Sequence, residues 1–105
     1  MTNDVFKALA HPARQAIVEK LSVGAATVGE ATRELGISKP TISEHLRVLE
    51  QAGVVTRVID GRTHRLALRP QGLIEASDWI EKQRARWESL FDAVGEYLDE
   101  RKEHG

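Results

Sequence analysis

The first part of the chain has apolar residues at the spacing of short amphipathic helices. A helix is predicted near the N-terminus, and a second opens at Pro12, where the missing N–H of proline costs nothing. A third opens at Thr27, which forms a capping box with Glu30, and should end near Gly36. The core-facing positions of the first two helices are Val5, Phe6 and Leu9, then Ala16, Ile17 and Leu21.

A fourth helix, residues 38–52, carries the most informative pattern. Ser38 can cap its start, Pro40 lies in its first turn and Gly53 supplies a stop. The helical repeat predicts a buried stripe of Ile42, Leu46 and Leu49 and an opposite face of Pro40, Ser43, Glu44, Arg47 and Gln51. Small hydroxyl side chains near a helix start let the backbone approach phosphates and base edges closely. The exposed face therefore favours a helix that enters a DNA groove over one that is merely solvated.

A β-hairpin is predicted over residues 54–69, where β-branched residues replace the helical pattern. Asp60 and Gly61 form the predicted two-residue turn. Pairing outward from this turn places Val55 opposite Leu66 and Arg57 across from His64. Arg62 and Arg65 lie near the tip, so the hairpin is expected to contact phosphates or the minor groove. A solvated hairpin whose arginines protect an exposed edge is the alternative.

The C-terminal region, residues 71–101, has apolar residues every seven positions, which predicts one long helical stripe. Asp78 and Glu81 have capping-box spacing, so a break near Ser77 into two helices is left open. A stripe of this length would expose a large apolar surface unless a second chain covered it. We expect a homodimer whose contacts include Val5, Phe6, Leu9, Leu73, Ile80, Trp87, Leu90, Phe91, Val94 and Leu98.

Composition restricts the class of protein. The 105 residues are enough for one domain, 1–105, and 41% of them are hydrophobic. The sequence contains no cysteine, which excludes disulfides and thiolate metal sites. It has no apolar run of the about 18 residues that a membrane helix needs, and no signal-peptide core, so we expect a cytoplasmic protein with no membrane partner.

The net charge of −1 hides an uneven distribution. Residues 38–69 hold six basic and three acidic side chains, a net charge of +3. Residues 71–105 hold five basic and nine acidic side chains, a net charge of −4, and residues 1–37 hold four of each sign. Positive charge is thus concentrated on the fourth helix and the hairpin, as expected of a surface that binds nucleic acid.

Three segments together resemble the ArsR family of bacterial winged-helix repressors: FKALAHPARQAIVEKLS, TVGEATRELGISKPTISEHLRVLEQAGVV and DGRTHRLAL. The resemblance covers nearly the whole chain and is most specific at residues 10–14 and 38–53. It implies a mainly α fold with a small β-hairpin, a winged helix-turn-helix of about five to six helices and a two-stranded wing. It also implies a homodimeric repressor that binds a palindromic operator in double-stranded DNA and is released by an inducer, which the sequence does not identify.

Carried over position by position, the operator contacts of the family fall on the recognition helix 38–52 and the wing 54–69. These residues are Lys39, Pro40, Thr41, Ser43, Glu44, His45, Arg47, Arg62, His64 and Arg65.

The chain departs from the metal sensors of this family, whose ligands are cysteines in the third helix or the N-terminal region, or Asp and His pairs along the C-terminal helix. The third-helix segment VGEATRE has no thiol, and the C-terminal region offers one imidazole, His104, four residues after Glu100. One imidazole with surface carboxylates is a poor zinc site, so no metal or other cofactor is predicted. His11 is expected to cap the helix that follows it. A metal-responsive repressor with a non-thiolate site remains an alternative.

Enzymatic function is not predicted. Ser43 and His45 are two residues apart on one helix, so their side chains diverge and cannot act as nucleophile and base. A glycine loop for phosphate is also absent. The stronger competitor is a winged-helix module that binds protein, because the fold alone does not imply DNA contact.

Overall fold

The computed structural model describes residues 2–104, with side chains described for residues 3–100. Within these residues the chain forms five helices and three strands. The elements are α1 (Thr2–Leu9), α2 (Pro12–Ser22), β1 (Ala26–Thr27), α3 (Val28–Thr32), α4 (Lys39–Gln51), β2 (Val55–Asp60), β3 (Thr63–Leu68) and α5 (Pro70–His104). This is the predicted mainly α architecture with a hairpin, and it is elongated, with extents of 73 × 26 × 22 Å.

Side chains cap three helices as the sequence predicts. His11 caps α2 by accepting a hydrogen bond at Nδ1 from the Ala13 N–H, at 3.1 Å. Thr27 caps α3, where its Oγ1 accepts from the Glu30 N–H at 3.2 Å and bonds to the Glu30 carboxylate at 2.9 Å. These caps satisfy backbone donors that have no partner in the first helical turn. The α3 helix ends at Thr32, earlier than the predicted end near Gly36.

The hydrophobic core lies where α1, α2, α4 and the base of the hairpin meet. Its largest fully buried side chains are Val5, Ile17, Leu46, Leu49, Val54 and Leu66. Val5 is 0% exposed within the single chain, so its predicted place in a dimer contact is wrong. The same spacing of apolar residues is expected for a core and for a dimer interface. Val5 packs in the core of its own chain.

The three strands form an antiparallel sheet in the order β1-β3-β2. The predicted hairpin is present, but its register is shifted by two residues, so Val55 pairs with Leu68 and Arg57 with Leu66. The shift arises because Asp60 and Thr63 form the last pair, which leaves Gly61 and Arg62 as the turn. Gly61 has φ 62°, the left-handed conformation that suits glycine at the first turn position. An even shift keeps every side chain on its expected face.

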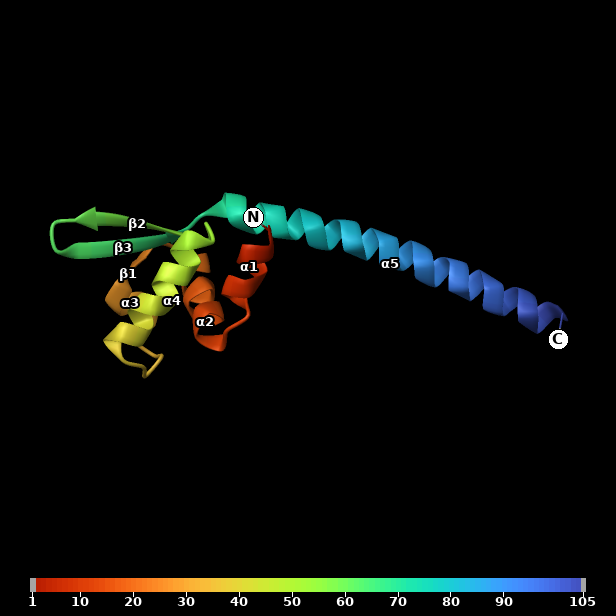
Figure 1. Cartoon of the computed structure of the whole chain (residues 1–105), viewed down its shortest axis with the longest axis horizontal. Helices are drawn as coiled ribbons and strands as arrows, with labels where there is room; N and C mark the ends of the chain where they lie inside the picture. Colours follow the sequence, from red (N-terminus) through yellow and green to blue (C-terminus); the bar gives the residue numbers. More distant parts are fainter. Residues whose placement is uncertain (1, 105) are drawn as a thin grey trace.

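Helix α5 is continuous from Pro70 to His104, so the break left open near Ser77 is absent. Figure 1 shows that it leaves the compact part of the molecule and extends away from it, while the hairpin projects from the other side. Its first turns pack on α1, where the Phe6 and Trp79 rings meet edge to face with centroids 5.3 Å apart. Its start also lies against the end of α4, since a Cβ on Gly72 would come within 2.6 Å of the Gly53 carbonyl oxygen. The start of α5 is therefore held beside the turn that follows α4.

Candidate nucleic-acid interface

The two faces of α4 have the predicted environments. Leu46 and Leu49 are buried and Ile42 is half-buried against the core. The opposite face is exposed at Pro40, Thr41, Ser43, Glu44, Arg47 and Gln51. The buried stripe fixes the helix to the body, and a polar face of three turns is left free to contact another molecule.

The start of α4 is exposed and capped. Ser38 Oγ accepts from the Thr41 N–H at 3.4 Å and lies 2.9 Å from Thr41 Oγ1. Lys39 is exposed beside this cap, and Pro40 follows it in the first turn. The positive end of the helix dipole and a lysine side chain thus point out of the same surface, which is a favourable setting for an anion such as a phosphate.

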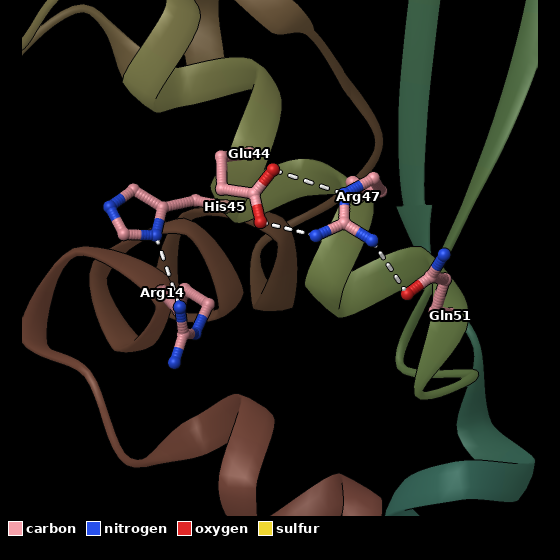
Figure 2. Close-up of polar contacts among 5 residues, drawn as sticks. All are labelled: Arg14, Glu44, His45, Arg47 and Gln51. Carbon is pink, nitrogen blue, oxygen red and sulfur yellow. Dashed lines mark hydrogen bonds and ion pairs between the residues drawn. The ribbon is translucent and has the colours of Figure 1, made fainter.

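Arg47 is held in place on the exposed face by two neighbours on its own helix. Its Nε donates to Glu44 Oε2 at 3.0 Å, its Nη2 pairs with Glu44 Oε1, and its Nη1 donates to Gln51 Oε1 at 3.0 Å (Figure 2). The hydrogen bond from Arg47 lowers the pKa of Glu44 below its usual value, and the same bond raises the pKa of Arg47. Glu44 therefore orients an arginine, which is a reason for a carboxylate to occur on this face.

His45 does not belong to the exposed face, which corrects its predicted position. It is 7% exposed and points toward α2, where its ring lies 4.4 Å from that of His11 between centroids. Arg14 donates to His45 Nδ1 at 3.2 Å, and Figure 2 shows this pair on the side of α4 away from Arg47. The sequence could have shown this, because the helical step of about 100° per residue places His45 only about 40° around the helix from the buried Leu49.

The hairpin carries the other predicted residues. Arg62 and Arg65 are exposed, and His64 is half-buried. Arg57, which the sequence did not mark as a site residue, connects the hairpin to α4: its Nε donates to Glu50 at 2.7 Å and its Nη1 to His64 Nδ1 at 3.0 Å. This partly buried network fixes the hairpin relative to the helix. The hairpin pattern had already placed Arg57 near His64, but no local sequence pattern signals the contact with Glu50.

Comparison with known proteins matches this arrangement to one family. A family model described as a helix-turn-helix domain matches residues 9–58. The transcriptional repressor SdpR of Bacillus subtilis is 36% identical over 78 residues, which are 74% of this chain and 87% of SdpR. A crystal structure of an ArsR family transcriptional regulator is 32% identical, with a TM-score of 0.78 over 83% of this chain and 90% of that chain. The chain belongs to the ArsR family.

Other relatives agree with this assignment. The regulator Rv2034 of Mycobacterium tuberculosis is 43% identical over 68 residues, which are 65% of this chain and 64% of Rv2034. An ArsR-like regulator from Rhodococcus sp. RHA1 has a TM-score of 0.73 at 26% identity and covers 89% of this chain and 88% of that chain. Membership of the ArsR family confirms the predicted winged helix-turn-helix fold and the prediction that the chain is not an enzyme.

Residues 3–100 contain no group of three or more His, Asp or Glu side chains that could hold a metal ion. The predicted pair of Glu100 and His104 lies partly outside them, because the side chain of His104 is not described. Within the described part of the chain, no helix has the length and apolar character needed to cross a membrane.

Proposed function

We propose that this ArsR family member is a homodimeric transcriptional repressor that binds a palindromic operator in double-stranded DNA. In each protomer α4 enters a major groove, and the hairpin of β2 and β3 acts as a wing on the adjacent backbone. The observation that carries the proposal is that α4 keeps an exposed polar face while Arg57 ties the hairpin, with its exposed Arg62 and Arg65, to Glu50 of the same helix. Operator binding would take place in the cytoplasm of a bacterium.

The proposed DNA contacts are divided by chemistry. Residues of α4 reach base edges, because a major groove admits one helix and presents a distinct pattern for each base pair. Hairpin residues contact phosphates or the minor groove, which positions the protein with little regard to sequence. The proposed contacts on α4 are Lys39, Pro40, Thr41, Ser43, Glu44 and Arg47, and those on the hairpin are Arg62, His64 and Arg65.

His45 is left out of this set because its side chain is buried against α2. Arg57 is also left out, because its guanidinium is half-buried between Glu50 and His64, whereas that of Arg47 is exposed.

The proposed dimer rests on the apolar surface of α5. Large side chains remain exposed along this helix, among them Trp87 at 63% and Phe91 at 65%. Monomeric proteins rarely expose a continuous apolar surface of this kind, so a second copy is the occupant that we propose. The exposed residues available to it are Ile74, Trp79, Ile80, Trp87, Leu90, Phe91, Val94, Tyr97 and Leu98. Phe6, Leu9 and Leu73 are half-buried and would lie at the edge of the contact.

Selection of bound DNA from a random pool tests the proposed function. Two α4 helices related by two-fold symmetry would face successive major grooves on one side of the duplex. The selected sequences are therefore expected to contain an inverted repeat whose half-sites are about 10 base pairs apart, or a multiple of that spacing. Recovery of no enriched sequence, with folding of the protein verified by circular dichroism, would contradict the proposal.

A further inference from the structure

A cluster of His11, Arg14 and His45 on the buried side of α4 connects this helix to α1 and α2. Arg14, from α2, donates from Nη1 to His45 Nδ1 on α4 at 3.2 Å. The same guanidinium donates from Nε to the Ala8 carbonyl oxygen at 2.6 Å and from Nη2 to that of Lys7 at 3.3 Å. One side chain thereby joins the C-terminal end of α1 to the recognition helix, through a single imidazole.

The hydrogen bond fixes the protonation state of that imidazole. Arginine has only donors, so the bond requires His45 Nδ1 to carry a lone pair and the ring to be neutral. His11 Nδ1 also accepts a hydrogen bond, from the Ala13 N–H. A proton on His45 Nδ1 would remove the acceptor and place two cations in contact.

The surroundings of His45 also disfavour its charged form. The ring is 7% exposed, with His11 and Arg14 facing it from α2 and Glu44 beside it on α4. From α1, Asp4 and Lys7 line the cleft that Arg14 also borders. The Glu44 carboxylate gives little compensation, because it is paired with Arg47. Burial, and then the neighbouring His11 ring and Arg14 guanidinium, lower the pKa of His45 below its usual value.

We infer that His45 is a positioning residue for DNA recognition: its neutral ring holds α4 against Arg14 in the orientation that binds DNA, and its protonation releases that orientation. This inference rests on the proposed function. A proton on Nδ1 is compatible only with arrangements in which α4 has moved away from Arg14. Lowering the pH therefore reduces the population of the DNA-binding arrangement. His45 thus makes specific binding depend on pH without touching DNA.

The sign of the pH effect distinguishes this role from ordinary electrostatics. Protonation of a histidine near phosphates adds positive charge and strengthens DNA binding. If His45 acts as inferred, lowering the pH from 8 to 5.5 instead weakens specific binding. Loss of a hydrogen bond to a charged group corresponds to about a tenfold decrease in affinity.

The test measures affinity for the sequence recovered by selection at pH 8, 7, 6 and 5.5, at constant ionic strength. Wild type should lose about tenfold in affinity over this range. His45→Asn places an amide oxygen where Nδ1 lies and cannot titrate, so it should bind within about threefold of wild type at pH 8 and show a flat profile. His104→Asn is the control for loss of a histidine and should keep the wild-type profile.

Two further measurements keep the test decisive if His45→Asn does not fold. Arg14→Met retains the length of the side chain but removes the charge that opposes protonation, so the acid-dependent loss should shrink. Imidazole nitrogen shifts in wild type should show His45 with its proton on Nε2 and an unprotonated Nδ1 at pH 7.

Several outcomes overturn the inference. Binding that strengthens or stays constant on acidification contradicts it, as does an unchanged profile in His45→Asn or in Arg14→Met. A protonated Nδ1 at pH 7 also contradicts it. If wild type shows no sequence-specific binding at pH 8, the proposed function fails and the inference fails with it. Specific binding with a flat profile rejects only the role of His45.

Discussion

The compact part of the chain, residues 3–69, and the long helix α5 differ in how far their large apolar side chains are exposed. In the compact part Ile17, Leu46 and Leu49 are within 1% of complete burial. Along α5, Trp87, Leu90 and Phe91 are each at least 60% exposed. The first region completes its own core and leaves only Val23, Val58 and Ile59 as exposed large apolar side chains, whereas the second presents a long apolar surface that the rest of the described chain does not cover.

This difference indicates a division of labour. The compact part holds α4 and the hairpin, so we assign DNA recognition to it, and we assign pairing of protomers to α5. The two regions are coupled where they join, because Gly72 of α5 lies against Gly53, and Arg69, the residue before α5, donates its N–H to the Val54 carbonyl at 2.7 Å. A dimer formed through α5 would therefore set the distance between the two recognition helices.

Truncation of a core residue should produce the largest effect on folding. Leu49→Ala removes a side chain that is 0% exposed, and we expect the free energy of unfolding to fall by about 2–5 kcal/mol. Urea denaturation followed by circular dichroism measures this. Leu90→Ala is the matched substitution on the exposed surface of α5. In dilute protein, where protomers are separate, Leu90→Ala should lower the free energy of unfolding much less than Leu49→Ala. An equal decrease would show that α5 is not exposed in the single chain.

Truncation of an aromatic residue on α5 should affect assembly. Trp87→Ala is expected to raise the dimer dissociation constant by about 30-fold, equivalent to about 2 kcal/mol, because buried aromatic residues dominate interface energies. Sedimentation equilibrium measures the constant, and Arg86→Ala, at an exposed polar position of the same helix, is the control. A wild-type protein that remains monomeric at micromolar concentration would exclude the dimer.

Changes on the proposed DNA surface should separate affinity from specificity. Arg62→Ala should weaken binding to all sequences and reduce the slope of log affinity against log salt by about 0.9, the contribution of one phosphate contact. Ser43→Ala should instead reduce the preference for the selected sequence over random DNA. Lys20→Ala, at an exposed position on α2, is the charge control. An unchanged slope in Arg62→Ala would reject the assignment of the hairpin as a wing.

The smallest effect is expected at Glu44. Glu44→Ala removes a negative charge from the DNA surface and frees Arg47, so nonspecific affinity should rise by about twofold to threefold and preference for the selected sequence should fall. Fluorescence anisotropy with selected and scrambled duplexes measures both quantities. A decrease in nonspecific affinity would show that the ion pair with Glu44 does not limit the contact of Arg47 with DNA.

Local signals in the sequence predicted much of the fold. The caps at His11, Thr27 and Ser38 lie within three residues of the donors that they satisfy, so spacing alone reveals them. The repeat in residues 38–52 likewise gave the buried and exposed faces of α4. The strand β1 and the register of the hairpin were not predicted, because their signals are weak. β1 has only two residues, and the Asp60 and Gly61 pair is compatible with either of two turn positions.

Features that depend on distant residues could not be predicted. Arg14 and His45 are 31 residues apart, and neither helix pattern indicates that they meet. Val5 could serve a core or an interface, because both select apolar residues. The charge pattern identified a basic hairpin, but the structure was needed to show that the Arg57 guanidinium binds Glu50 of α4.

Mapping backbone amide shifts on addition of the selected DNA duplex tests the central claim most directly, because both regions are observed in one experiment. The largest changes are expected in residues 38–47 and 61–65, with small changes in residues 87–98. Changes centred on residues 87–98, or none in residues 38–47 when DNA is bound, would contradict recognition of DNA by the exposed face of α4.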